Sequence, residues 1–122
     1  MNLLIYGENL YDKSHFKDDF INKYGNSSDY RFFYLDNIDL NQLSTEVVSY
    51  DMFRQNKCIV LKKIESDEKN INIAKIDSII ADSINPNNSI LIDWDGKLNK
   101  EIQKTYIFKN FEKKIFNNPA NK

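Results

Sequence analysis

The stretch that decides the fold is residues 49–64, which read Ser-Tyr-Asp-Met-Phe-Arg-Gln-Asn-Lys-Cys-Ile-Val-Leu-Lys-Lys-Ile. Its second half contains an unbroken apolar run, residues 58–61. Such a run is typical of a strand covered on both faces, as in the centre of a parallel sheet. Its first half places Tyr50, Met52 and Phe53 where a helix is expected to end and a polar loop to begin. Because connecting segments normally run over the surface, these three side chains either fold back as a lid or form an exposed interaction site.

Strands and helices are predicted to alternate on both sides of this stretch. Runs rich in apolar residues predict strands at 3–6, 30–35, 57–63 and 89–92, and residues 112–116 are interpreted as a last strand before Asn117-Asn118-Pro119. Helical spacing of apolar residues predicts helices at 10–24, 39–50 and 73–84, and a fourth that carries Leu98, Ile102 and Tyr106. This order predicts an α/β fold, with a parallel five-stranded sheet flanked by helices on both faces.

Length and composition limit the class of protein. The chain has 122 residues, a net charge of −1 and a hydrophobic fraction of 41%, which indicates one globular domain over residues 1–122. The single cysteine, Cys58, excludes a disulfide or a cysteine metal site within one chain and favours a reducing, cytoplasmic compartment. No apolar stretch reaches membrane-spanning length, so no membrane partner is expected.

The segment between the first strand and the first helix has the position of a phosphate-binding loop. Residues 7–14 read Gly-Glu-Asn-Leu-Tyr-Asp-Lys-Ser, whereas the phosphate-binding pattern requires a glycine where Asp12 stands. The third strand also ends in Lys62 and Lys63 instead of the magnesium-binding acid of a nucleotide hydrolase. We therefore interpret the loop as an ordinary capped connection. A divergent ATPase acting through Lys13 and Ser14 is the alternative, and titration with labelled ATP and magnesium separates the two.

Other polar residues are interpreted as structural. Asp93 and Asp95 either form a turn closed by Gly96 or hold a metal ion, and the turn is favoured because no His or Cys stands near them. Trp94 is expected to cover the edge of the sheet. A larger group is expected to be solvated surface residues without a face for nucleic acid: His15, Lys62, Lys63, Lys69, Lys113 and Lys114.

Taken together, these residues resemble the N-terminal domain of the delta subunit of the bacterial DNA polymerase III clamp loader. The resemblance lies in the order of five short features and covers nearly the whole chain. They are an opening apolar strand with Tyr6-Gly7-Glu8, the apolar pair Met52-Phe53, the strand at 58–61, Lys97-Leu98-Asn99-Lys100 in a helix, and a final short strand before Pro119.

The resemblance implies an AAA+/P-loop-like topology with a degenerate nucleotide site, no catalytic residues, no cofactor and no metal. It also implies that Met52 and Phe53, with Tyr50 in support, insert into a pocket of the ring-shaped beta sliding clamp and help to open it during DNA replication. Contact with DNA is expected to be indirect. Met52 replaces the usual leucine of the family, which is a volume-conserving change.

The family's subunits continue into a lid and a helical collar, through which they join the other clamp-loader subunits. These domains are absent from residues 1–122, so the chain is expected to be a fragment or a reduced protein. The remaining alternative is a generic α/β protein-interaction domain with an unrelated partner.

Overall fold

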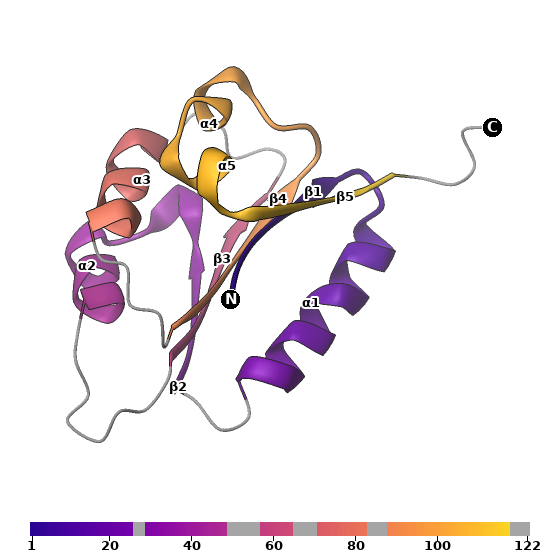
Figure 1. The fold of residues 1–122 in the computed structure, drawn as a ribbon, viewed down its shortest axis with the longest axis horizontal. Coiled ribbons are helices and arrows are strands. Elements are labelled where there is room, and N and C mark those ends of the chain that lie inside the picture. Colours follow the sequence, from indigo (N-terminus) through magenta and orange to yellow (C-terminus); the bar gives the residue numbers. More distant parts are fainter. Residues whose placement is uncertain (26–28, 49–56, 65–70, 83–87, 118–122) are drawn as a thin grey trace.

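Five parallel strands form one sheet in the spatial order β2-β3-β4-β1-β5 (Figure 1). A computed structural model describes residues 1–25, 29–48, 57–64, 71–82 and 88–117 of the chain. The strands are β1 (Asn2–Gly7), β2 (Asp29–Tyr34), β3 (Lys57–Lys63), β4 (Ser89–Asp95) and β5 (Glu112–Phe116). The predicted parallel five-stranded α/β sheet is therefore confirmed, and β2 and β5 are its edges.

Helices cover both faces of the sheet unequally (Figure 1). One face carries α1 (Leu10–Tyr24). The other face carries the remaining helices, which are α2 (Leu40–Val48), α3 (Ile73–Asp82), α4 (Lys100–Gln103) and α5 (Tyr106–Asn110), while a short 3-10 helix, η1 (Leu35–Asn37), follows β2. The predicted start of α2 is confirmed, because Asp39 Oδ1 accepts hydrogen bonds from the backbone N–H groups of Asn41 and Gln42 at 2.9 and 3.2 Å.

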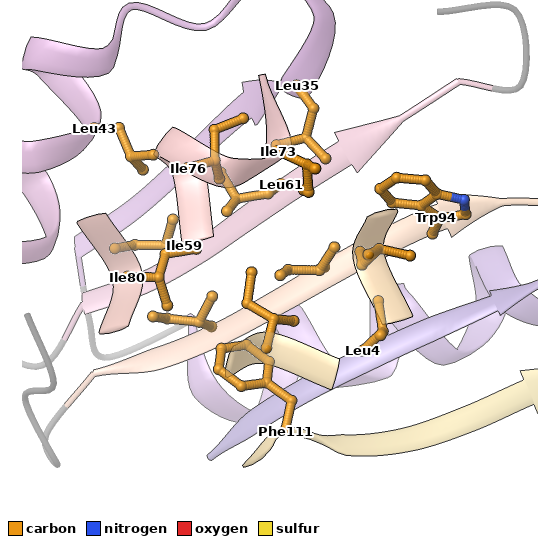
Figure 2. Packing of buried hydrophobic residues seen from close by; sticks show 14 of the residues in the cluster. Leu4, Leu35, Leu43, Ile59, Leu61, Ile73, Ile76, Ile80, Trp94 and Phe111 are labelled. Carbon is orange, nitrogen blue, oxygen red and sulfur yellow. The ribbon is translucent and has the colours of Figure 1, made fainter. Parts of the chain in front are cut away.

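The alternation of side chains along each strand divides the core into two layers. Leu4, Ile59, Leu61, Ile92 and Trp94 face α2 to α5, where they pack with residues such as Leu43, Ile76 and Phe111 (Figure 2). Leu3, Ile5, Cys58, Val60 and Leu91 face α1 and pack against Phe20. Cys58 is fully buried, as predicted for a small apolar core residue. Because successive residues of a strand point to opposite faces, the polar side chains that end β3 and β4 are also assigned to defined faces.

The predicted fourth helix is in fact two short helices. Thr105 separates them, since its hydroxyl donates to the carbonyl of Ile102 in α4 and accepts the N–H of Phe108 in α5 at 3.1 Å. Asp77 of α3 also accepts the N–H groups of Tyr106 and Ile107, at 3.0 and 2.9 Å. The helix begins anew at Tyr106 because a carboxylate from another helix caps it there.

Gly25 ends α1 with a φ of −98°, outside the left-handed region, and a Cβ there would lie only 2.6 Å from the carbonyl oxygen of Ile21. Gly25 thus serves close approach and not backbone handedness. Trp94 does not cover the sheet's edge, because β4 is the middle strand and the indole is 1% exposed within the core.

Candidate functional site

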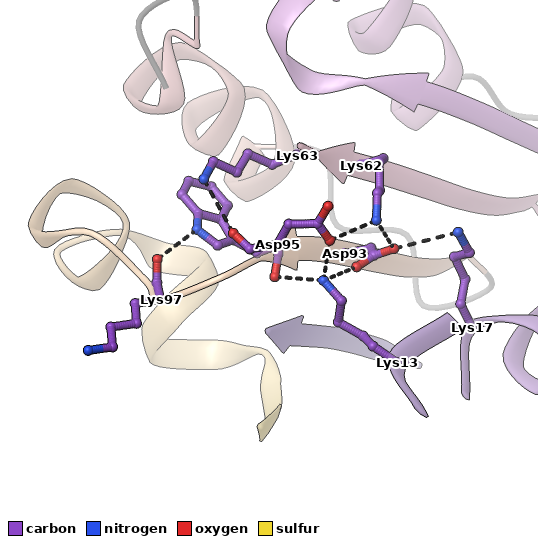
Figure 3. Close-up of polar contacts among 8 residues, drawn as sticks. Lys13, Lys17, Lys62, Lys63, Asp93, Asp95 and Lys97 are labelled. Atoms are coloured by element: carbon purple, nitrogen blue, oxygen red, sulfur yellow. Dashed lines mark hydrogen bonds and ion pairs between the residues drawn. The ribbon is translucent and has the colours of Figure 1, made fainter. Parts of the chain in front are cut away.

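Charged side chains gather at the carboxyl ends of β3 and β4, on the face covered by α1 (Figure 3). Asp93 and Asp95 alternate with the core residue Trp94, so both point toward α1. Lys62 of β3 lies beside Asp93 in the parallel register and points the same way. Lys13 and Lys17 extend from α1, which covers this face of the sheet, toward the same carboxylates. We call these five residues, Lys13, Lys17, Lys62, Asp93 and Asp95, the lysine–aspartate cluster.

Lys13 lies at the centre of the cluster and is 1% exposed. Its ammonium nitrogen lies 2.9 Å from the carbonyl oxygen of Trp94 and 2.8 Å from Asp93 Oδ1, and it also pairs with Asp95 Oδ1. The Asp93 contact is an ion pair whose angle is not that of a hydrogen bond. A buried ammonium group needs several acceptors, and Lys13 has three around its nitrogen.

The other two lysines of the cluster, Lys62 and Lys17, contact the carboxylates from the side nearer β2. Lys62 Nζ lies 3.0 Å from Asp93 Oδ2 and 2.8 Å from Asp95 Oδ1, and Lys17 Nζ lies 3.6 Å from Asp93 Oδ2. Three ammonium groups therefore face two carboxylates, and the cluster has a formal charge of +1. Both carboxylates are almost enclosed, since the Asp93 and Asp95 side chains are 1% and 9% exposed.

These contacts shift the protonation equilibria of the cluster. Burial works against ionisation of Asp95, but hydrogen bonds and attraction from Lys13 and Lys62 outweigh it and hold the pKa of that carboxyl below its ordinary value. Burial likewise disfavours the charged form of Lys62, yet Asp95 and Asp93 outweigh it and raise the pKa of that ammonium group. Both groups are thus held in their charged forms by each other.

We expect acid to weaken the fold through Asp95. Because the pKa of Asp95 is lower in the folded chain, the unfolded chain binds the proton first as the pH falls, and stability decreases below about pH 4. By the same linkage, the raised pKa of Lys62 makes stability decrease above about pH 10. Urea unfolding as a function of pH measures both effects.

An Asp95→Asn variant should be less stable at neutral pH but should lose less stability on acidification than wild type. The exposed Asp19→Asn variant should keep the wild-type profile, and an unchanged acid response in Asp95→Asn would contradict the expectation.

The loop between β1 and α1 is closed by backbone hydrogen bonds. Gly7 and Gly96 exchange two of them, each 2.9 Å long, across the gap between β1 and β4. The N–H of Asn9 donates to the carbonyl of Phe116 at 3.0 Å, and that of Asp12 donates to Asn9 Oδ1 at 3.1 Å. A phosphate-binding loop turns its N–H groups toward the ligand. In this loop, those of Gly7, Asn9 and Asp12 are already bound within the chain.

The structure corrects the interpretation of several charged residues. Lys62 and Lys63 are not solvated: Lys62 belongs to the cluster, and Lys63 is 1% exposed with its nitrogen 4.9 Å from the centre of the Trp94 ring. Asp93 and Asp95 belong to β4 and not to a turn. Among the described residues, no group of three or more metal-ligating side chains occurs. His15 is exposed, as predicted.

A sequence signal for the cluster existed. In a parallel sheet the carboxyl ends of neighbouring strands meet at one edge, and ligand sites in open α/β sheets lie outside that edge. Lys62, Asp93 and Asp95 lie at the ends of two adjacent strands, and Lys13 is the fourth residue of α1, the helix that follows β1. The missing information was that β3 and β4 are neighbours, which the sequence alone does not provide.

The predicted clamp-binding residues Tyr50, Met52 and Phe53 lie outside the described residues. The helix before them, α2, ends at Val48, and β3 begins at Lys57.

Comparisons with protein-family models, with curated proteins and with solved structures find no match for this chain. Within the described ranges, no helix has the length and apolar character needed to cross a bilayer.

Proposed function

We propose that this chain is a non-enzymatic module of a replicative clamp loader, with an AAA+-like fold whose nucleotide site is degenerate. The clamp-loader assignment rests on the order of the sequence motifs, and the observation that supports its non-enzymatic part is the ion pairing of Lys13 with Asp93 and Asp95. In a phosphate-binding loop the corresponding lysine reaches the terminal phosphates of the nucleotide. Here two carboxylates of the same chain surround that ammonium group.

The surroundings of Lys13 support the same conclusion. A nucleotide phosphate arriving here meets two carboxylates, and like charges at short range repel strongly in a partly buried site. The backbone N–H groups of Gly7 and Asn9, which a phosphate needs as donors, bond to Gly96 and Phe116. An ATPase acting through Lys13 and Ser14 requires all of these contacts to break first.

The binding function is assigned to the connection between α2 and β3. Met52 and Phe53 are proposed as the anchors that enter a hydrophobic pocket of the sliding clamp, and Tyr50 supports them. Burial of a methionine or phenylalanine side chain is worth about 1.5–3 kcal/mol, and a few such anchors commonly dominate an interface. Other clamp-loader subunits are proposed as further partners, through domains that residues 1–122 do not contain.

Opening of the clamp requires more than adhesion. A ligand shifts a conformational equilibrium only by the difference in its affinity for the two states. The module is therefore proposed to bind the opened or distorted ring more tightly than the closed ring.

The test is titration of the cognate sliding clamp with wild type and a Met52→Ala/Phe53→Ala variant. We expect the variant to bind about 100-fold more weakly or worse, because truncation of each interface anchor commonly costs about 2 kcal/mol or more. A Leu10→Ala/Tyr11→Ala variant is the matched control, since these side chains form another apolar pair and are 51% and 74% exposed. It should bind like wild type.

Two outcomes would contradict the assignment. Equal clamp binding by the test and control variants would remove Met52 and Phe53 from the interface. A marked loss of thermal stability in the test variant alone would mean that the pair belongs to the core.

A further inference from the structure

The charge of this protein is unevenly distributed along the chain. Residues 97–114 contain six lysines and two glutamates, a net charge of +4. The whole chain has a net charge of −1, so the rest carries −5. An exposed segment of one sign within a nearly neutral protein is a candidate surface for a partner of the opposite sign.

Five of these lysines belong to one layer of the fold. Lys97, Lys100, Lys104 and Lys109 lie on or beside α4 and α5, and all four are exposed. Lys113 of β5 pairs in register with Leu4, which faces those helices, and its ammonium nitrogen lies 4.8 Å from the centre of the Phe108 ring. We call these five residues the lysine face.

The lysine face differs from the lysine–aspartate cluster in lacking counter-charges. Within the described part of the chain, none of its ammonium groups pairs with a carboxylate. Glu112 pairs in register with Leu3 and so faces α1, and Asp77 is engaged in capping α5. Glu101 of α4 is the other acidic residue of the segment 97–114, and it is exposed. The positive field of the lysine face is therefore directed outward.

A pocket of about 520 Å³ opens beside the lysine face. Its walls include the apolar side chains of Tyr6, Leu98, Phe108 and Ile115, and its polar lining is formed by Glu8, Lys97, Gln103 and Asn117. Aromatic and apolar walls with an amide at the margin suit a planar heterocycle. An acidic peptide offers carboxylates to the lysines but fills the pocket only where it also carries an aromatic side chain, whereas every nucleotide of a single strand carries a base.

We propose that the lysine face binds single-stranded nucleic acid, with phosphates along Lys97, Lys100 and Lys109 and one unstacked base in the adjacent pocket. A single strand offers its bases, whereas a duplex keeps them stacked. The excess of lysine in residues 97–114 is visible in the sequence, but its lysines were interpreted as scattered surface charges; that five of them belong to one layer is given only by the fold. This binding is independent of the proposed clamp contact, which involves residues 50–53.

The experiment uses fluorescence anisotropy of a labelled oligothymidylate of about 20 nucleotides at about 50 mM salt. The test variant is Lys100→Glu/Lys109→Glu. The control is Lys23→Glu/Lys114→Glu, which has the same net charge; both of its lysines are exposed, and Lys23 and Lys109 each occupy the last turn of a helix. We expect the test variant to bind about tenfold more weakly and the logarithmic salt slope to become shallower by about 1.4, since each phosphate contact contributes roughly 0.7. The control should stay within about twofold of wild type.

Several results would overturn the proposal. The first is absence of binding by wild type at about 50 mM salt, and the second is an equal loss in both variants, which would indicate a general charge effect. The third is binding of a duplex of the same length as tightly as the single strand, which would leave no role for the pocket. The fourth is displacement of the oligonucleotide by polyglutamate as efficiently as by unlabelled oligothymidylate, which would identify an acidic polypeptide as the fitting partner.

Discussion

Replacement of Asp93 by asparagine is expected to lower the free energy of unfolding by about 3–5 kcal/mol, because removal of one partner from a buried ion pair leaves the remaining charges uncompensated. Asp93 contacts Lys13, Lys17 and Lys62 and is 1% exposed. The substitution keeps the shape of the side chain but leaves three ammonium groups facing Asp95 alone. Urea unfolding followed by circular dichroism at neutral pH measures the change.

The excess of lysine makes this effect asymmetric. A Lys13→Met substitution leaves Lys17 and Lys62 to balance the two carboxylates, so we expect it to destabilise the fold less than Asp93→Asn does. The double variant should recover part of the loss, since a neutral pair can replace a buried ion pair at little cost. Costs that simply add in the double variant would show that Lys13 and Asp93 are not energetically coupled.

Replacement of Gly7 by alanine is expected to destabilise the fold by about 3–5 kcal/mol, through backbone strain and overpacking together. Gly7 has a φ of 124°, a conformation that other residues rarely adopt. A Cβ there would lie 2.1 Å from the carbonyl oxygen of Phe116, and backbone atoms cannot move aside as a flexible side chain can. β1, β5 and the loop before α1, which contact one another here, would have to move apart.

Gly25→Ala is the comparison for Gly7→Ala. Gly25 is also crowded, with a Cβ position 2.6 Å from the Ile21 carbonyl oxygen, but its φ of −98° suits any residue. We expect a smaller loss of stability there, in the same urea assay. Equal losses at the two positions would mean that the positive φ of Gly7 contributes nothing.

The elements of this fold were predictable because their signals are local. Apolar runs identified four of the five strands, the fifth being the mixed stretch Glu112–Phe116, and the predicted start at residue 39 lies next to Leu40, where α2 begins. The break between α4 and α5 was predictable only in part, because Thr105 caps α5 locally, whereas Asp77, which caps the same turn, lies 29 positions away from Tyr106. The sequence pattern from Leu98 to Tyr106 is that of one helix, and a tertiary hydrogen bond overrides it.

The candidate site was only partly predictable for the same reason. The sequence has Asp12 where the phosphate-binding pattern requires a glycine, and this pointed to a degenerate phosphate-binding loop. The partner of Lys13 was not predictable, since Asp95 lies 82 positions away in the chain. Lys62 and Lys63 were interpreted as solvated because lysine is rarely buried without a partner, and the partners are on another strand.

The paired carboxylates on β4 have one more consequence. Carboxylates that belong to the chain cannot diffuse away as a bound anion can. The lysines of the lysine–aspartate cluster therefore keep these neutralising groups at any concentration of a small anion. Domains that respond to a small anion rearrange as it arrives and departs, whereas this corner keeps its neutralising groups through every encounter. A change in the neutralising charge of the lysine–aspartate cluster therefore requires titration of its groups at acid or alkaline pH.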